Sequence, residues 1–275
     1  MTDVEDTAAG ATRPGADSGP VEVFVETLER QAIECRWYAP TRTAAPTLVL
    51  LHEGIGSIAL WKGFPADLAA ATGCGTMVYS RHGYGWSSGR EAPFGVDYLH
   101  REALVTLPAL LDKRGIDDPV LIGHSDGASI AIIHAGGSGR PVRGIVLEAP
   151  HVFVEDLTIT SIEQTRTAFH DTDLEVRLGR YHRDPRASFF GWNDIWLDPA
   201  FRSWNIESYL PRVRCPTLAI QGADDHYGTL AQIDAIERQV AGPFRKRILA
   251  DCGHVPHFAQ PAAILEAIRT FVAAL

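Results

Sequence analysis

A serine stands between two glycines in the stretch GHSDG, residues 123–127, which separates a strand-forming run from a helix-favouring run. A G-x-S-x-G stretch in this context is typical of the nucleophile elbow, a sharp turn that holds a serine hydroxyl above a sheet. Because strand and helix approach closely there, Gly123 and Gly127 leave room that side chains would occupy. The pattern predicts that Ser125 is a nucleophile facing the N-terminal amides of the next helix, which favour developing negative charge.

The base and the carboxylate that such a serine needs follow two later strand-like runs. Asp224 and Asp225 end the run TLAIQGADD, and His254 follows the run RILADCG. The chain order is therefore serine, aspartate, histidine. Each candidate lies at the carboxyl end of a strand-like run, where parallel sheets collect their functional residues. On this evidence either aspartate can orient the histidine.

Strand-like and helix-like runs alternate along residues 21–151 and again along residues 213–275. This alternation predicts an α/β fold with a mostly parallel sheet and helices on both faces. Strand signals fade in residues 152–212, where short helical runs are mixed with aromatic residues, so we expect an inserted helical cap. Residues 1–20 contain no aromatic residue and one valine, which predicts a flexible N-terminal tail.

Together these features resemble the α/β-hydrolase family across nearly all of residues 21–275. The resemblance implies the α/β-hydrolase fold with Ser125 as the nucleophile. It also implies His254 as general base and then general acid, oriented by Asp225. Family members usually have the acid in a G-x-x-D stretch, and GADD therefore favours Asp225 over Asp224. The serine excludes the dehalogenase and epoxide-hydrolase branches of the resemblance, which have an aspartate there.

The resemblance also implies an oxyanion hole made of two backbone N–H groups. One comes from the residue after the nucleophile, Asp126. The other comes from the loop HEGIGS, residues 52–57, where alignment without gaps assigns it to Gly54. Relatives more often have a glycine after the histidine of this loop, so Glu53 is a departure. It is either a carboxylate of the pocket or a partner in a salt bridge of the loop.

The substrate pocket has fewer sequence markers. His151 ends a strand-like run at the expected active-site edge, where contact with substrate and a structural role are both open. The aromatic residues of the insertion either form its own small core or cover the pocket, as caps do in relatives, and both can hold at once. Trp192, Trp196 and Trp204 are the first candidates for substrate contact.

A second pattern in the loop after the third strand-like run is the degenerate dinucleotide motif G-x-G-x-x-A. Gly54 and Gly56 would then hold a pyrophosphate, and Arg81 would receive a 2′-phosphate. We favour the hydrolase interpretation because the dinucleotide motif leaves the serine, aspartate and histidine unexplained. No two histidines have the i, i+4 spacing with a glutamate that marks a zinc helix. We therefore expect neither a cofactor nor a metal.

Composition limits the partners. The 275-residue chain has a formal net charge of −9 and no basic block, which argues against nucleic acid and anionic membranes as partners. No basic segment followed by an apolar run marks a signal peptide, and no run is long enough to span a membrane. We expect a cytoplasmic protein whose partner is a small-molecule substrate. A homodimer is an open alternative.

The expected activity is hydrolysis of a carboxylic ester of a small apolar or aromatic substrate through an acyl-enzyme. Two enzymatic alternatives use the same triad: hydrolysis of a carbon–carbon bond in a vinylogous diketone, and lactone opening. An alternative from another class is a ligand-binding protein with a vestigial triad. Pocket polarity, rather than the triad, decides between the enzymatic alternatives.

Overall fold

One sheet forms the centre of the molecule. A computed structural model describes residues 20–28 and 30–275, so the flexible tail predicted for residues 1–20 lies, apart from residue 20, outside the described residues. Eight strands pair in the order β1-β2-β4-β3-β5-β6-β7-β8. The strands are β1 (Val21–Leu28), β2 (Gln31–Tyr38), β3 (Thr47–Leu51), β4 (Gly75–Tyr79), β5 (Val120–His124), β6 (Gly144–Glu148), β7 (Thr217–Gly222) and β8 (Phe244–Leu249).

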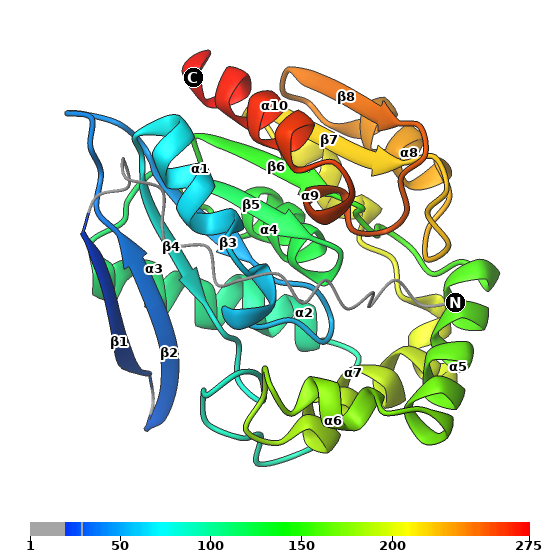
Figure 1. The fold of residues 1–275 in the computed structure, drawn as a ribbon. Helices are drawn as coiled ribbons and strands as arrows, with labels where there is room; N and C mark the ends of the chain where they lie inside the picture. The colour runs from blue at the N-terminus through cyan, green and yellow to red at the C-terminus, as the bar shows by residue number, and fades with distance from the viewer. Residues whose placement is uncertain (1–19, 29) are drawn as a thin grey trace.

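Helices cover both faces of this sheet (Figure 1). Strand β2 pairs antiparallel with β1 and with β4, and the remaining neighbours are parallel. The predicted fold class is therefore confirmed. The covering helices are α1 (Phe64–Thr72), α9 (Pro256–Ala259) and α10 (Pro261–Ala273) on one face, and α2 (Tyr98–Arg101), α3 (Leu107–Arg114), α4 (Asp126–Gly137) and α8 (Ala231–Gln239) on the other. A π-helical segment, residues 102–106, joins α2 to α3.

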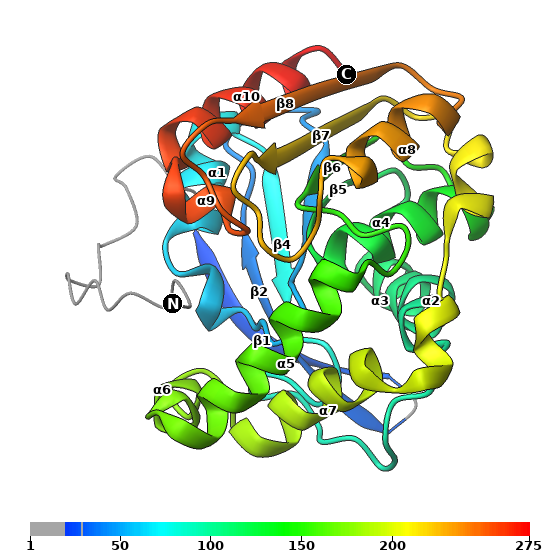
Figure 2. The same cartoon turned by 90° about the vertical axis from the view of Figure 1, so that its right-hand side faces the viewer.

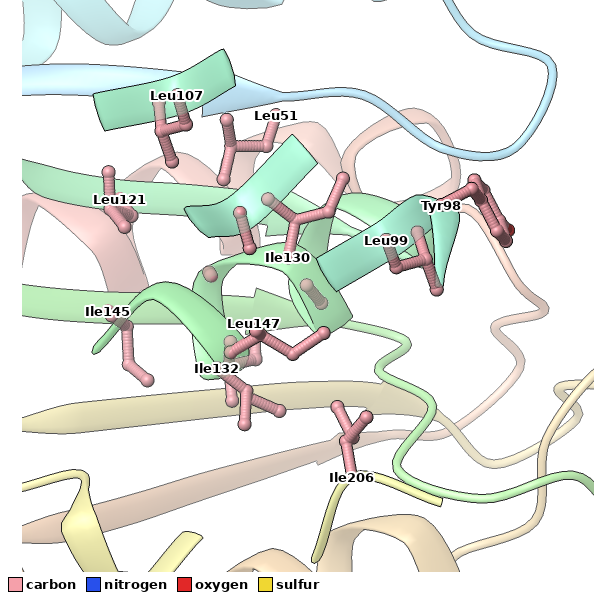
Figure 3. Packing of buried hydrophobic residues seen from close by; sticks show 14 of the residues in the cluster. Leu51, Tyr98, Leu99, Leu107, Leu121, Ile130, Ile132, Ile145, Leu147 and Ile206 are labelled. Carbon is pink, nitrogen blue, oxygen red and sulfur yellow. The ribbon is translucent and has the colours of Figure 1, made fainter. Parts of the chain in front are cut away.

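Two apolar cores lie on the two faces of the sheet. Successive strand side chains point to opposite faces, so Leu121 of β5 packs on the α4 side and Ile122 packs on the side of α1 and α10. Figure 3 shows Ile130 and Ile132 of α4 beside Leu147 of β6. Each such side chain, removed from water, contributes about 1.5–3 kcal/mol. This packing fixes α4, and with it the turn that precedes it.

The segment between β6 and β7 forms a group of helices beyond the sheet (Figure 2). An antiparallel bridge joins Phe153 to Asn205, and the amide of Ile206 donates a hydrogen bond to the carbonyl oxygen of Val152 (2.8 Å). The chain thus enters and leaves the group at one place. Its members are α5 (Asp156–Asp171), α6 (Leu174–Leu178), α7 (Pro185–Leu197) and the 3-10 turn η3 (Pro199–Ser203), and a further 3-10 turn, η4 (Glu207–Arg212), follows the bridge and packs on α4 and α8.

Local sequence explains where α7 begins. Asp184 precedes the helix, and its carboxylate accepts a hydrogen bond from the amide of Ala187 (2.8 Å). Pro185 occupies the first turn, where its missing N–H costs nothing. The helix then packs Phe189 on Phe169 of α5, with ring centroids 4.1 Å apart. The helical group therefore has aromatic contacts of its own, and they orient the remaining side chains of α7.

No helix among the described residues has the length and apolar character needed to cross a lipid bilayer.

Candidate active site

Ser125 occupies the turn between β5 and α4. Its backbone has φ 52° and ψ −116°, a conformation that side-chain-bearing residues seldom adopt. A Cβ atom at Gly123 would overlap the carbonyl group of Gly127, and one at Gly127 would overlap the carbonyl oxygen of Leu51. Glycine is therefore needed at both positions, because the helix starts directly against the ends of β3 and β5. Strain of this kind is commonly stored at functional sites.

Three side chains meet at the carboxyl ends of three strands. Nε2 of His254 lies 3.1 Å from the hydroxyl oxygen of Ser125. Nδ1 of the same ring lies 2.9 Å from each carboxylate oxygen of Asp225. The neighbouring Asp224 is exposed to solvent. The structure therefore brings Ser125, His254 and Asp225 together in the order that a proton relay requires, and Asp224 takes no part in it.

The Asp225 carboxylate is held in its ionised form. Burial alone would raise its pKa, but the charge of His254, the hydrogen bond to that ring and the amide of Tyr227 outweigh burial. The pKa of Asp225 consequently lies well below its ordinary value. The Tyr227 amide donates at 2.8 Å, and the side-chain amide of Gln221 donates at 3.2 Å. An ionised carboxylate at this position can stabilise a protonated His254.

A second charged pair, His124 and Glu53, is hydrogen-bonded to the backbone of His254. Nε2 of His124 donates a hydrogen bond to the carbonyl oxygen of His254 (2.7 Å), and Nδ1 lies 3.6 Å from a carboxylate oxygen of Glu53. Burial would lower the pKa of His124, but Glu53 raises it above its usual value. Burial would raise the pKa of Glu53, but His124 holds it at about 2. Of the two roles considered for Glu53, the ion pair is formed, although its partner lies outside its own loop.

The amides of Gly54 and Asp126 lie in the two segments that approach each other beside the serine. Asp126 is the first residue of α4, and Gly54 lies in the loop that follows β3. Neither amide donates a hydrogen bond to another group in the described part of the chain. Both N–H groups are therefore available to an oxygen atom of a bound ligand.

His151 lies deep beside the reacting groups. It is 2 % exposed, and its ring centroid is 5.7 Å from that of His254. Burial and then the charge of His254 lower the pKa of His151 to about 3, so the imidazole is neutral at ordinary pH. Its Nδ1 atom has no hydrogen-bond partner among the described side chains and backbone groups. A neutral, unsatisfied ring nitrogen at this position can bond to a polar group of a ligand.

Two tryptophans of α7 contact the segments that contain Gly54 and Asp126. The indole of Trp192 lies against Gly54, where a Cβ atom would overlap it. The indole N–H of Trp196 donates hydrogen bonds to the hydroxyl oxygen of Tyr98 (3.0 Å) and to a carboxylate oxygen of Asp126 (3.3 Å). These two side chains therefore contact the segments that precede and follow the serine turn from the side of the insertion.

Trp204 has a different setting. Its ring stacks on Phe201 with centroids 5.3 Å apart and lies 5.9 Å from the ring of Trp196. The structure thus places Trp192 against Gly54 and Trp196 against Asp126, whereas Trp204 packs on Phe201 and Trp196.

Tyr227 and Arg81 are part of this region, although no sequence pattern assigned an active-site role to Tyr227 and Arg81 was considered only under the dinucleotide motif. The Tyr227 ring lies 4.7 Å from that of His254, and its hydroxyl lies 2.6 Å from the hydroxyl of Thr165 in α5. The sequence signal that could have identified Tyr227 was its position two residues after Asp225. Arg81 is 3 % exposed and faces protein carboxylates, so it is not placed to receive a 2′-phosphate.

A separate groove of about 500 Å³ lies between the loop after β4 and the outer side of α7. Its lining includes Gly83, Arg90, Phe94, Phe190 and Asp194, and it includes no member of the Ser125 cluster. The groove is open to solvent and does not reach the serine. The groove is therefore separate from the cluster of Ser125, His254 and Asp225.

Comparison with known proteins gives a consistent family. Residues 48–267 match the family model described as "Alpha/beta hydrolase family". The chain is 28 % identical over 187 residues to N-formylmaleamate deformylase of Pseudomonas putida, covering 62 % of this chain and 68 % of that protein. It is 26 % identical over 200 residues to 2-succinyl-6-hydroxy-2,4-cyclohexadiene-1-carboxylate synthase of Serratia proteamaculans, covering 60 % and 72 %.

Solved structures show the same fold. The enol-lactonase from Burkholderia xenovorans superposes with a TM-score of 0.70 at 15 % identity, covering 90 % of this chain and 99 % of that chain. The esterase RhEst1 from a Rhodococcus species superposes with a TM-score of 0.68 at 20 % identity, covering 93 % and 99 %.

Proposed function

Because the chain belongs to the alpha/beta hydrolase family, we propose that it is a serine hydrolase that cleaves carboxylic esters of small apolar or aromatic substrates. The observation that carries the proposal is the contact sequence from the Ser125 hydroxyl through His254 to Asp225, with distances of 3.1 Å and 2.9 Å. A serine without a base is a poor nucleophile, and this arrangement supplies both the base and its counter-charge.

The reaction proceeds in two halves. In the first, Ser125 attacks the ester carbonyl while Nε2 of His254 takes the hydroxyl proton, and Asp225 stabilises the resulting imidazolium. The negative charge that develops on the carbonyl oxygen is bound by the amides of Gly54 and Asp126. In known enzymes the loss of one such donor costs about 2.7–4 kcal/mol of transition-state stabilisation.

The first half ends when His254 gives its proton to the alkoxide leaving group, which departs as the alcohol while the acyl group stays on Ser125 as an ester. In the second half His254 takes a proton from water as the water oxygen attacks the acyl-enzyme, and the acid leaves as Ser125 regains its proton. His151 can bond to a polar group of the substrate because its Nδ1 atom has no partner in the described residues. The indoles of Trp192 and Trp196, beside Gly54 and Asp126, favour apolar or aromatic acyl and alcohol groups.

The test is turnover together with covalent labelling. We expect the purified protein to hydrolyse short-chain p-nitrophenyl esters and to be labelled by a fluorophosphonate at Ser125. The variant Ser125→Ala should lose both properties and keep the wild-type melting temperature. Ser203→Ala removes an exposed hydroxyl and serves as the control, with activity unchanged. Ester turnover that survives in Ser125→Ala would contradict the nucleophile assignment.

The same assay distinguishes the alternatives. Lactone opening and carbon–carbon hydrolysis use the same triad, so the panel includes an aryl lactone and a dienoic diketone. An N-formyl amide is added because the relative from Pseudomonas putida is named N-formylmaleamate deformylase. Esters should be cleaved with the highest kcat/KM. Binding without turnover of any member would favour the ligand-binding alternative.

A further inference from the structure

We propose that Arg81 is a positioning residue that holds the two amides of the oxyanion hole in register, an inference that rests on the proposed function. Arg81 follows β4 and is 3 % exposed. Its Nη2 atom donates a hydrogen bond to the carbonyl oxygen of Glu53 (2.7 Å) and lies 3.5 Å from a carboxylate oxygen of Asp126. One nitrogen atom therefore joins the loop after β3 to the start of α4.

The contact with Glu53 sets the direction of the Gly54 amide. The carbonyl group of Glu53 and the N–H of Gly54 belong to one planar trans peptide unit, so they point in opposite directions. Nδ1 of His52 (2.7 Å) and the amide of Gly56 (3.1 Å) also donate to the Glu53 oxygen. With its oxygen held by three donors, of which only Arg81 is permanently charged, the peptide plane cannot rotate freely, and its N–H is directed away from Arg81. The charged donor also polarises the peptide, which makes that N–H a stronger donor.

The contact with Asp126 fixes the other amide. The Asp126 carboxylate is buried and receives hydrogen bonds from the Tyr98 hydroxyl (2.8 Å) and the Trp196 indole (3.3 Å). Arg81 supplies the opposite charge, without which this buried carboxylate would be unpaired. A side chain held by several partners restricts its own backbone, including the N–H that follows the nucleophile.

The guanidinium group suits this task better than an ammonium group. It is planar and permanently charged, and it spreads its donors over a rigid fork. The backbone amide of Arg81 also donates to Nε2 of His52 (3.0 Å), which anchors the residue to the same loop. Arg81 does not touch the reacting atoms in this arrangement. It acts through the peptide of Glu53 and through Asp126.

The test compares Arg81→Gln and Arg81→Lys with the wild type on the best p-nitrophenyl ester. Displacing a catalytic group by about 1 Å costs about 10²-fold in rate. We expect Arg81→Gln to lower kcat about 100-fold with KM changed less than threefold, and Arg81→Lys to recover part of the loss. The affinity of a trifluoromethyl ketone with the same acyl group, which forms the oxyanion, should fall by the same factor as kcat/KM.

Glu102→Gln is the matched control. It removes a buried charge close to Arg81, keeps the acceptor for the Tyr79 hydroxyl and touches neither oxyanion segment. Its kcat should stay within threefold of the wild type. An Arg81→Gln variant that folds and keeps its kcat would overturn the proposal. A rise in KM with unchanged kcat and unchanged ketone affinity would overturn it too, since that result describes substrate binding alone.

A structure of the wild-type protein phosphonylated at Ser125 tests the proposal without any variant. The phosphonyl oxygen should accept hydrogen bonds from the amides of Gly54 and Asp126, with Arg81 still on both partners. An oxygen directed elsewhere would reject the role of Arg81 even if Arg81→Gln does not fold. Failure of the proposed function has a different signature, because the wild type itself would then show neither turnover nor fluorophosphonate labelling.

Discussion

At the scale of single residues, the site depends on how each titrating group is paired. Asp225 is kept ionised by His254 and two amide donors, and Glu53 is kept ionised by His124. His151 has no charged partner of this kind and is neutral through burial. The two acids and the neutral ring thus have different chemistry although they lie in one small region.

The adjacent residues Asp224 and Asp225 allow a direct test of the role of charge pairing. Asp225→Asn keeps the shape of the side chain but removes the charge that stabilises the His254 imidazolium. We expect kcat for ester hydrolysis to fall about 10⁴-fold, as in other triads with this change. Asp224→Asn, which alters the exposed neighbour, should leave kcat unchanged. Equal losses in both variants would show that net charge, and not the contact with His254, is responsible.

At the scale of elements, α7 joins the insertion to the catalytic core. Trp196 contributes one such contact: its indole N–H bonds to Tyr98 of α2 and to Asp126 of α4. The ring also lies 5.3 Å from that of His151. The position of α7 is consequently linked to the position of Asp126, the residue whose amide we propose as an oxyanion donor.

Trp196→Phe removes the indole N–H and with it the hydrogen bonds to Tyr98 and Asp126. The phenyl ring keeps the packing on Phe201 but has no donor for the Asp126 carboxylate. Loss of a bond to a charged group should lower the free energy of unfolding by about 1.5–3 kcal/mol and reduce kcat. Trp204→Phe is the control, because the indole nitrogen of Trp204 has no partner among the described residues. Denaturant unfolding of both variants measures the difference, and equal destabilisation would argue against the bond.

The sequence predicted the elements better than it predicted their contacts. The alternating runs gave a mostly parallel α/β sheet, which is confirmed, and the order of Ser125, Asp225 and His254 gave residues that the structure brings together. These features follow from short local sequence patterns and from the order of residues along the chain. The contact of Arg81 with Asp126 joins segments that lie 45 residues apart and depends on the strand order, which no local pattern encodes. The π-helical turn at residues 102–106 likewise has no separate signal in an ordinary helical run.

At the scale of the whole molecule, buried histidines make stability depend on pH. Burial lowers the pKa of His52, His134, His151 and His182 below the usual value. An unfolded histidine binds a proton below about pH 6.5, whereas these buried rings do not. Each therefore costs stability as the pH falls below 6.5. His124, whose pKa is raised, acts in the opposite sense, and the stability it contributes is lost as the pH rises through its folded-state pKa.

His151 provides the measurable case. Its folded-state pKa is about 3, so between pH 6.5 and pH 3 the unfolded chain binds one proton more at this residue. The free energy of unfolding should fall by about 1.4 kcal/mol for each pH unit from this group alone. We measure the free energy of unfolding in urea between pH 4.5 and 6. The slope of this free energy against pH should correspond to one proton fewer in His151→Leu than in the wild type. The exposed His170 supplies the control substitution, and a wild-type slope in His151→Leu would contradict the prediction.

The bridge between Phe153 and Asn205 has a consequence for how such proteins diversify. Since both ends of the insertion meet beside β6 and β7, a lineage can lengthen, shorten or exchange the intervening chain without moving the strands that carry the reaction. Selection for a new substrate can therefore act on this module while the chemistry is inherited intact. A transplanted module would, however, have to replace the contacts that the insertion makes with the core, among them those of Trp196 with Asp126, Trp192 with Gly54 and Thr165 with Tyr227.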